Sequence, residues 1–469
     1  MHTEHFSLTA NAFWVLKADY KSNTTEISDL VDDAEFDENF SQDLIQRSQQ
    51  ALLSPIARLD QELSWLPELS SNQTEEISSL LASNELNKLV GAVDFLPDLP
   101  KANVLAHLCG TNSIEEKVLQ NLLQAWDDIR EIDLLSFVNS ERQIAGFPKV
   151  EMAQLENAVK AIGSKHARNA AMAVWKFNAP GKLMETLVEE ELRRGSTSSI
   201  LAQFVREYDN LSEPKLVQIS DSIEGKIKQV SEPRCDLEGV VDEISDLLRQ
   251  WDDVNQAVQV FEQHQGHEEG RSKRIYEKVR ELCLELANDR SEFLQAKRLS
   301  EALLHTFPEL ESVAEVLRGD VETLESLDEQ KRQFAVVEPL VAACETAKQK
   351  LRKLKLELQK TGFKQARGGL LHEIFVAFEN AAKSPEARDA AFLIVRDLAL
   401  FANNERDDPE TAFRLIDGLL TYRSMDLSRN CSAPLTWYFA TKESHHGTET
   451  NPGIPRRGSA RSVDERLAS

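Results

Sequence analysis

Apolar residues recur every three or four positions along most of this chain, which is the spacing that places side chains on one face of an α-helix. One such stretch occurs twice, because Val279–Leu304 returns as Val395–Leu420 at a constant offset of 116 residues. Each copy predicts a helix, a short polar turn and a second helix. A helical hairpin cannot bury its apolar face alone, so its recurrence predicts an all-α fold of stacked, repeat-like hairpins.

The two copies share apolar and small residues where helices would pack, and an asparagine where each first helix would end. The shared positions are Val279 and Val395, Leu282 and Leu398, Asn288 and Asn404, Ala296 and Ala412, and Leu303 and Leu419. We interpret the two asparagines as helix C-cap residues, because asparagine tolerates the backbone geometry found there.

A second, shorter pattern places a tryptophan after two leucines in two predicted helices. The stretch Leu122–Ile129 returns as Leu247–Val254, so that Trp126 and Trp251 occupy matching positions. Tryptophan at this spacing is typical of a core anchor in helix packing, and we favour that interpretation over a shared binding face. The first copy lies within Val118–Val138, which the apolar spacing predicts as one helix.

Proline and glycine indicate where the helices end. They divide residues 141–235 into predicted short helices, and Pro339 interrupts a predicted helix over Val336–Lys360, which we expect to pack as an antiparallel hairpin. The predicted organisation is a small helical domain (1–69), a helical connecting domain (70–235), a first repeat unit (236–310), a long helical hairpin (311–369), a second repeat unit (370–430) and a disordered tail (431–469).

The charge balance limits which partners the chain can bind. Asp and Glu number 79 against 54 Lys and Arg, and a net charge of −25 repels phosphate backbones and anionic lipids. We therefore expect protein partners, and neither nucleic acid nor a membrane; the oligomeric state stays open. No apolar run reaches the roughly 18 residues of a spanning helix. Five separated cysteines and an N-terminus without a signal-peptide pattern predict a reducing, cytoplasmic setting.

No residue pattern points to catalysis or to a bound cofactor. Gly181-Lys182 has the ending of a phosphate-binding loop, but Lys176 stands where that loop needs glycine. His264 and His267 have the spacing of two helical metal ligands, yet the surrounding glycines favour a solvated loop. We predict no catalytic, cofactor or metal site and a chain that is not an enzyme; a site assembled from distant residues stays open as a third hypothesis.

Four arginines recur at matching positions of the two hairpins. They are Arg280 and Arg396 in the first helices, and Arg298 and Arg414 in the second helices. One interpretation pairs them internally with the acidic turn residues Asp289 and Glu405. The other makes them a basic face that binds a carboxylate of a partner peptide, since a guanidinium group suits bidentate recognition. These four arginines are the candidate partner-binding residues.

Two stretches near the N-terminus resemble the J-domain, the small helical domain of J-type cochaperones. Asn11–Leu16 is similar to the opening of that family, and Gln50–Asp60 is similar to its last helix. The family stimulates a heat-shock ATPase through a His-Pro-Asp loop and a basic second helix. Here no histidine lies between His5 and His107, and Glu26–Phe40 is strongly acidic. The resemblance therefore implies a degenerate J-like domain that does not stimulate this ATPase in the ordinary way.

The repeated hairpins resemble tetratricopeptide units, with the small residue Ala296 early in a second helix, although the full consensus is missing. A degenerate J-like start followed by such hairpins is similar to a little-characterised set of bacterial proteins. The resemblance implies a non-enzymatic interaction scaffold or chaperone-associated adaptor, whose hairpins bind one protein and whose J-like domain docks another. The alternative is a regulatory or structural subunit of a larger stress or defence assembly.

Overall fold

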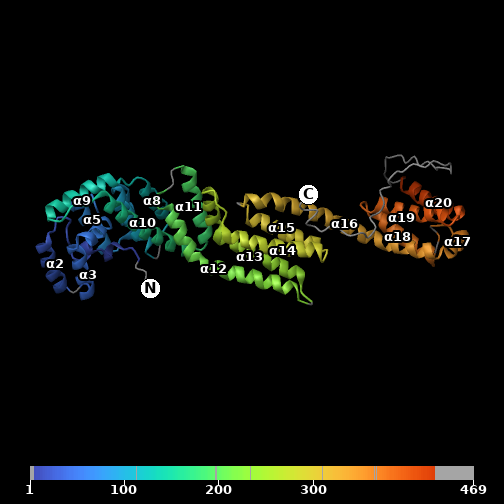
Figure 1. Cartoon of the computed structure of the whole chain (residues 1–469), viewed down its shortest axis with the longest axis horizontal. Coiled ribbons are helices and arrows are strands. Elements are labelled where there is room, and N and C mark those ends of the chain that lie inside the picture. Colours follow the sequence, from blue (N-terminus) through green and yellow to red (C-terminus); the bar gives the residue numbers. More distant parts are fainter. Residues whose placement is uncertain are drawn as a thin grey trace. The chain divides into compact units, whose positions relative to one another are not determined.

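The structure is a computed structural model, and it describes residues 5–37, 39–111, 114–195, 198–232, 234–308, 310–363, 365 and 367–427. Within these ranges all regular elements are helices, which confirms the all-α prediction (Figure 1). None of the described helices has the length and apolar character needed to cross a membrane. The predicted tail, 431–469, lies outside the described residues.

The chain forms two compact units, Met1–Leu282 with Leu299–Leu317, and Cys283–Arg298 with Arg318–Ser469. The helices of the first unit are η1 Leu8–Ala10, α1 Ala12–Val15, α2 Thr24–Asp37, α3 Gln42–Leu53, α4 Pro55–Leu63, α5 Ser71–Ala82, α6 Leu86–Ala92, η2 Val93–Phe95, α7 Asp98–Cys109, α8 Glu116–Asp127, α9 Glu131–Ala145, α10 Met152–Trp175, α11 Pro180–Arg194, α12 Leu201–Val230 and α13 Leu237–His264. Both units contribute to α14 Gly270–Asn288, α15 Phe293–Thr306 and α16 Glu311–Gln349; the second unit continues with α17 Leu351–Lys360, α18 Leu370–Lys383, α19 Arg388–Asn404 and α20 Pro409–Leu427.

Helices α1 to α4 pack on one another at the N-terminal end of the first unit. Side chains of Asn11, Ser41 and Ser54 accept backbone N–H groups at the starts of α1, α3 and α4, as expected for N-cap residues. Asn23 caps α2 in the same way, because its Oδ1 accepts the N–H of Thr25 at 2.9 Å. These caps fix where the first helices begin, and the J-like assignment stays a prediction.

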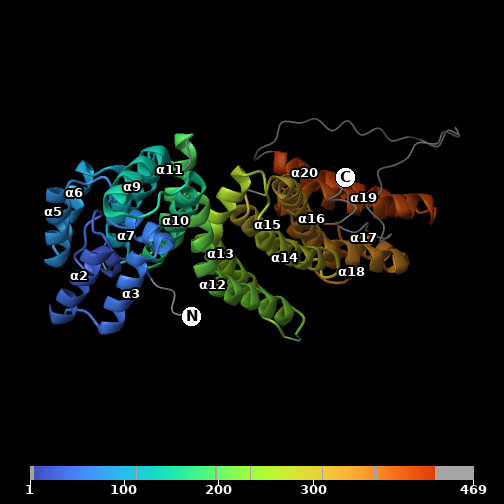
Figure 2. The same ribbon diagram turned by 60° about the vertical axis from the view of Figure 1, so that its left-hand side comes forward.

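Helix α10 is the central element of the first unit. Figure 2 shows it beside α7, α9 and α11. Its buried face is rich in small residues, which allow neighbouring helices to approach closely. One of them, Gly163, lies against the indole ring of Trp126 from α8. The core of this unit therefore forms around one long helix that contacts neighbours on several sides.

The predicted short helices over 141–235 are wrong, because α10, α11 and α12 span 24, 15 and 30 residues. Helix α12 continues through Pro214, which removes one backbone donor. Buried side chains on both sides of that proline, Tyr208 and Leu216 among them, hold the helix together by tertiary packing. Packing thus outweighs the local signal that proline provides.

The predicted single helix over Val118–Val138 is divided in the structure. Helix α8 ends at Asp127 and α9 starts at Glu131. Glu131 and Asp133 lie in the first turn of α9, where negative charge is favourable next to the unpaired N–H groups. An equivalent pair of aspartates follows Trp251, but there α13 continues without a break.

Both copies of the repeated hairpin have the same helix boundaries at the turn and the same buried positions. Helices α14 and α19 end at Asn288 and Asn404, and α15 and α20 begin at Phe293 and Pro409, so each boundary keeps the offset of 116 residues. Matching apolar side chains are buried in both copies: Val279 and Val395, Leu282 and Leu398, Leu299 and Leu415, Leu303 and Leu419. The duplicated hairpin predicted from the sequence is confirmed at the level of helices and core positions.

The turns of the two hairpins also match in their backbone geometry. Ser291 and Asp407 occupy equivalent positions and both have positive φ, at 56° and 52°. The residue after each donates its N–H across the turn, from 292 to the carbonyl oxygen of Leu286 at 2.8 Å and from 408 to that of Ala402 at 2.9 Å. The helix cap of α19 is Glu405, one residue later than predicted. The duplication therefore extends from the side chains to the path of the backbone.

The long antiparallel hairpin predicted over 311–369 is not what the structure contains. Helix α16 continues through Pro339 to Gln349, and α17 begins at Leu351. One linking residue, Lys350, is too short a connection for an antiparallel return. Helix α17 packs instead on α18 and α20, and its buried residues Leu354 and Leu358 join the core of the second unit.

The core of the second unit forms around an aromatic cluster from α18 to α20 and from Phe363, which lies between α17 and α18. Phe378 contacts Phe363, Phe392 and Tyr422 in edge-to-face arrangements, with ring centroids 5.0 to 5.9 Å apart. Such pairs are favourable beyond the area they bury. Gly418 lies against Phe363, where a larger residue would overlap the ring. This cluster holds the second hairpin to the helices that precede it.

Candidate functional site

The four predicted partner-binding arginines lie on hairpin helices and differ in exposure. Arg280, Arg298 and Arg396 are partly buried, whereas Arg414 is exposed. Arg298 donates from Nη1 to Oε1 of Gln295 at 3.2 Å, one turn earlier in α15. Arg396 and Arg414 come from α19 and α20, two helices that pack directly on each other. These residues stay candidates for binding a partner.

Arg414 shows what contacts an arginine of this group makes. It donates from Nη2 to Oε1 of Glu410 at 3.2 Å and from Nη1 to the carbonyl oxygen of Leu358 at 3.3 Å. Its carboxylate partner is therefore a residue of its own helix, rather than the turn residue Glu405 suggested by the sequence. The pair is exposed on both sides, so Arg414 can exchange this partner for another carboxylate at little cost.

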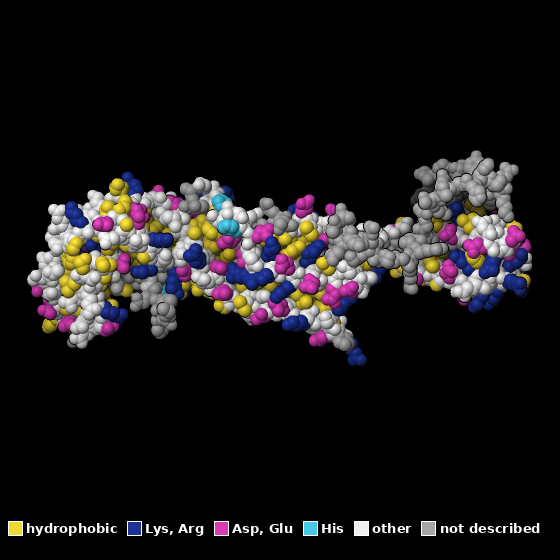
Figure 3. Space-filling view, in the orientation of Figure 1, with side chains coloured by type: hydrophobic (Ala, Val, Ile, Leu, Met, Phe, Trp, Pro, Cys, Tyr) yellow, Lys and Arg dark blue, Asp and Glu magenta, His cyan; other side chains and the backbone are white. Residues whose placement is uncertain are grey.

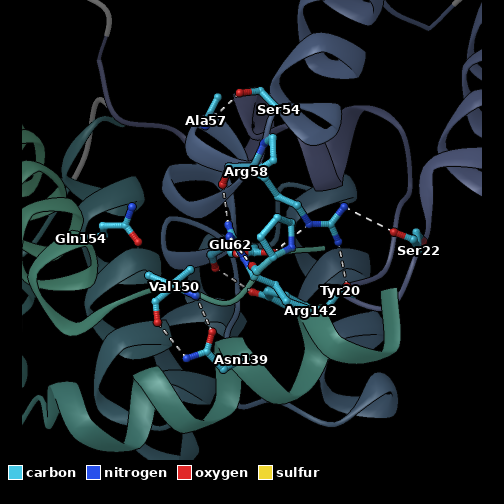
Figure 4. A network of polar contacts seen from close by, with 12 residues as sticks. Tyr20, Ser22, Ser54, Ala57, Arg58, Glu62, Asn139, Arg142, Val150 and Gln154 are labelled. Atoms are coloured by element: carbon cyan, nitrogen blue, oxygen red, sulfur yellow. Dashed lines mark hydrogen bonds and ion pairs between the residues drawn. The ribbon is translucent and has the colours of Figure 1, made fainter. Parts of the chain in front are cut away.

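A different group of charged residues is completely enclosed in the first unit (Figure 4). The side chains of Arg58, Glu62 and Arg142 are 0%, 1% and 2% exposed. Arg58 and Glu62 are four residues apart in α4, which places them one above the other on the same helix face. Arg142 reaches them from the last turn of α9. We call these three residues the buried triad.

Arg58 uses all of its donor nitrogens inside the protein. Its Nε donates to Oε1 of Glu62 at 2.8 Å, and its Nη1 and Nη2 donate to the carbonyl oxygens of Ser22 and Tyr20 at 3.3 and 2.7 Å. The guanidinium group also lies over the ring of Phe147, 4.1 Å from its centre. These contacts attach the segment between α1 and α2 to α4.

Arg142 is paired in the same manner and attaches α9. Its Nε donates to Oε2 of Glu62 at 2.7 Å, so the two carboxylate oxygens of Glu62 serve one arginine each. Its Nη2 and Nη1 donate to the carbonyl oxygens of Pro55 and Pro148 at 2.9 and 3.3 Å. One carboxylate and four carbonyl oxygens thus balance two buried guanidinium groups.

Burial shifts the pKa values of Glu62, Arg58 and the neighbouring Tyr20. It raises the pKa of Glu62, against the opposing effect of Arg142 and Arg58. Burial also lowers the pKa of Arg58, against the effect of Glu62. The pKa of Tyr20 is raised well above its usual value by burial and by the charge of Glu62. All hydrogen-bond partners of the buried triad are residues inside the first unit, so none of its groups is available to a substrate. The triad therefore has a structural role, because it holds α4, α9 and the segment between α1 and α2 together.

A second polar cluster caps the start of α14. Glu269 accepts the backbone N–H groups of Arg271 and Ser272 at 2.9 and 2.8 Å and the hydroxyl of Ser272 at 2.7 Å. Burial would raise the pKa of Glu269, but these hydrogen bonds and the Arg271 charge lower it overall. Arg271 also pairs with Asp209 of α12. The cluster therefore joins α12 to the first helix of the repeated hairpin.

The two matching tryptophans are both core anchors, which confirms the favoured interpretation. Trp126 and Trp251 are buried, and each donates its indole N–H at 3.2 Å, to Nδ1 of His166 and to Oγ of Ser272. Burial lowers the pKa of His166 to about 3, so this ring is neutral at physiological pH. Its Nδ1 accepts a hydrogen bond, which assigns the proton of the neutral ring to Nε2.

Two surface depressions of the first unit are predominantly polar. One, with a volume of about 500 Å³, is lined by Gln120, Glu190, Arg193 and Arg194. The other, of about 140 Å³, includes Glu68 and Asp98, whose pKa values are raised by burial and by neighbouring carboxylates. Among the described residues no three His, Cys, Asp or Glu side chains are placed to hold a metal ion.

The sequence contains one signal that could have identified the buried triad. Arg142 lies in line with Leu134, Val138 and Ala145 on the buried face of α9, where an apolar residue is expected. A charged residue at such a position predicts a buried partner. Comparison of the chain with protein families, with curated proteins and with solved structures gives no match.

Proposed function

We propose that the chain is a non-enzymatic scaffold or chaperone-associated adaptor that binds another protein through its helical hairpins. The observation that supports this most is the duplicated hairpin, in which helix ends, the positive-φ turn residue and the turn hydrogen bonds all recur at one offset. Helical-repeat proteins use duplicated units of this kind to form extended binding surfaces. The partner is a protein that presents carboxylate groups to the repeated arginines.

The contacts of Arg414 make it the arginine best suited to begin such binding. Its side chain is 42% exposed and is paired with Glu410, which is 47% exposed. Exposed pairs four residues apart in a helix contribute only about 0.3–0.5 kcal/mol. A carboxylate of a partner can therefore replace Glu410 and form two parallel hydrogen bonds with the guanidinium group.

The proposal is tested by reciprocal affinity purification of the full chain and mass spectrometry. We expect a partner protein to co-purify at fixed stoichiometry. Arg298→Glu with Arg414→Glu, and separately Arg280→Glu with Arg396→Glu, should reduce its recovery at least about tenfold, which corresponds to about 1.4 kcal/mol of binding free energy. Circular dichroism and melting temperature establish that each variant is folded.

The matched control reverses arginines outside the hairpins. Arg168 is partly buried on α10 and Arg206 is exposed on α12, so Arg168→Glu and Arg206→Glu change the net charge by the same amount. We expect these variants to keep the partner. Equal loss with the control pair, or unchanged binding when all four hairpin arginines are reversed in a folded chain, contradicts the proposal.

A further inference from the structure

Helix α17 in the second unit carries an exposed basic face. It holds Arg352, Lys353, Lys355 and Lys360 against one acidic residue, Glu357. Of these, Arg352, Lys353 and Lys360 are exposed. Figure 3 shows Lys and Arg side chains gathered at the α17 end of this unit. In a chain with a net charge of −25, such a face is a local exception.

An apolar residue lies at the centre of this basic face. Leu356 is 56% exposed, although the other leucines at 354 and 358 on the opposite side of α17 are buried. Arg352 precedes Leu356 by one turn and Lys360 follows it by one turn. A leucine between two cations can contact an apolar side chain of another helix while the cations pair with carboxylates on that helix.

Helix α2 in the first unit has the complementary pattern. Its 14 residues include six Asp and Glu and no Lys or Arg. Asp29, Asp32 and Asp33 are exposed, and none of the three has an ion-pair partner within the described part of the chain. Phe36 follows them by about one turn and is 89% exposed, which is the highest value among the large apolar side chains described.

We propose that α2 of one copy of this chain binds α17 of a second copy. The aspartates of α2 would pair with Arg352, Lys353 and Lys360, and Phe36 would pack against Leu356. The contact joins two different surfaces, so it either occurs twice in a two-fold dimer or continues head to tail into larger oligomers. The inference rests on the two helix faces and does not depend on the hairpins binding another protein.

The size of the two helices predicts a weak, salt-dependent association. Helix α2 is about 21 Å long and α17 about 15 Å, so the contact is at the small end of specific interfaces. Charge complementarity then supplies much of the specificity and the association rate. Salt screens such exposed charges over about 10 Å at 0.1 M ionic strength. We expect micromolar self-association at low salt and a monomer at high salt.

Sedimentation velocity of the full chain over a range of concentrations tests the proposal. We expect the average mass to rise with concentration at low salt. Arg352→Glu with Lys353→Glu in α17, and separately Asp29→Lys with Asp32→Lys in α2, should each weaken association at least about tenfold. Phe36→Ser and Leu356→Ser should also weaken it, and these two variants leave the charges unchanged.

A charge-exchange experiment distinguishes a direct contact from general electrostatics. A chain that carries both sets of reversals places lysines on α2 where the partner's α17 now has glutamates, so the exchanged pairs attract and its self-association should return. A mixture of the two singly reversed chains should also associate, because the native α17 of one meets the native α2 of the other. Lys160→Glu with Lys165→Glu, on exposed positions of α10, is the matched control and should associate like the unchanged chain.

Several outcomes would overturn the proposal. The first is a chain that is monomeric at all concentrations and salts. The second is association that the α2 and α17 reversals do not weaken, or that charge exchange does not restore. The third is an α17 face that binds a nucleic-acid oligomer or anionic lipid vesicles while the chain stays monomeric, which would assign the basic face to a phosphate-bearing partner.

Discussion

At the scale of single residues, Glu62 holds two buried guanidinium groups in place. Replacing Glu62 with glutamine removes its charge and leaves Arg58 and Arg142 without a buried counter-ion. Breaking a buried ion pair from one side typically costs about 3–5 kcal/mol. We expect Glu62→Gln to lower the free energy of unfolding of the first unit by that amount, measured by urea denaturation.

The control for Glu62 is an ion pair at the surface. Glu189 pairs with Arg193 four residues later in α11, and both side chains are largely exposed. Glu189→Gln should change the free energy of unfolding by less than about 1 kcal/mol. If Glu62→Gln lowers the free energy of unfolding no more than Glu189→Gln does, the buried triad does not stabilise the first unit as its contacts indicate.

His166 makes stability depend on pH in a defined window. The unfolded chain binds a proton at this residue near pH 6.5, whereas the folded chain keeps the ring neutral down to about pH 3. The contribution of neutral His166 is therefore complete above pH 6.5 and is lost as pH falls towards 3, by about 1.4 kcal/mol per pH unit. His166→Gln keeps an acceptor for Trp126 and should give a shallower loss of stability below pH 6.5. Parallel curves for both proteins would exclude this role.

Gly181 lies where the backbones of α11 and α13 come close together. A Cβ atom at this position of α11 would overlap the carbonyl oxygen of Asp253 in α13. Gly225 in α12 has open space where its Cβ would be and is a matched helical control. We expect Gly181→Ala to lower the melting temperature by several degrees, and Gly225→Ala to raise stability by about 0.5–1 kcal/mol. Two effects of the same sign would contradict this account.

At the scale of elements, the turn of the repeated hairpin gives a prediction that tests the duplication itself. Ser291 and Asp407 are exposed and share a positive φ, a conformation that β-branched residues adopt only under strain. Ser291→Val and Asp407→Val should each lower the free energy of unfolding by about 1–3 kcal/mol, whereas glycine at either position should be tolerated. A marked difference between the two positions, measured by chemical denaturation, would mean that the turns are alike only in outline.

The sequence predicts the hairpins well because their information is local and periodic. The matching apolar residues set the buried faces, and a turn of fixed length sets where the second helix begins. Predictions that depended on proline were poor, since α12 and α16 continue through Pro214 and Pro339. A proline removes one hydrogen bond, whereas packing along a long helix contributes many contacts. The strength of that packing depends on residues far away in the chain.

The buried triad was not predicted, for a related reason. Arg58 and Glu62 have the spacing of an ordinary surface ion pair, and only the position of α9 shows that they are enclosed. Their second partner, Arg142, lies 80 residues after Glu62. No local pattern specifies a contact over that distance. A candidate site that is assembled from separate elements is therefore the part of this molecule least accessible from sequence.

At the scale of the whole molecule, the sequence resemblance of the N-terminal stretches to a J-domain raises the question of whether the chain acts on a heat-shock ATPase. The sequence resemblance implies that α2 corresponds to the second helix of a J-domain, which is basic in that family. Here α2 carries six acidic residues and no basic ones. The same resemblance implies a His-Pro-Asp loop after this helix, where the chain has Asn39 and Phe40 instead. A surface of the wrong charge without that loop should repel the acidic contact that a basic helix recognises.

We therefore expect the purified chain to leave the steady-state ATP turnover of a heat-shock ATPase unchanged, at protein ratios where an authentic J-domain stimulates it. A phosphate-release assay measures this, with the authentic domain as the positive control. A variant in which Asp29, Asp32 and Asp33 are replaced by lysine distinguishes the effect of the α2 charge from the effect of the missing loop. Because the loop is still missing, this variant should bind the ATPase more tightly without raising turnover, and stimulation by either chain would show that the degenerate domain keeps the cochaperone activity.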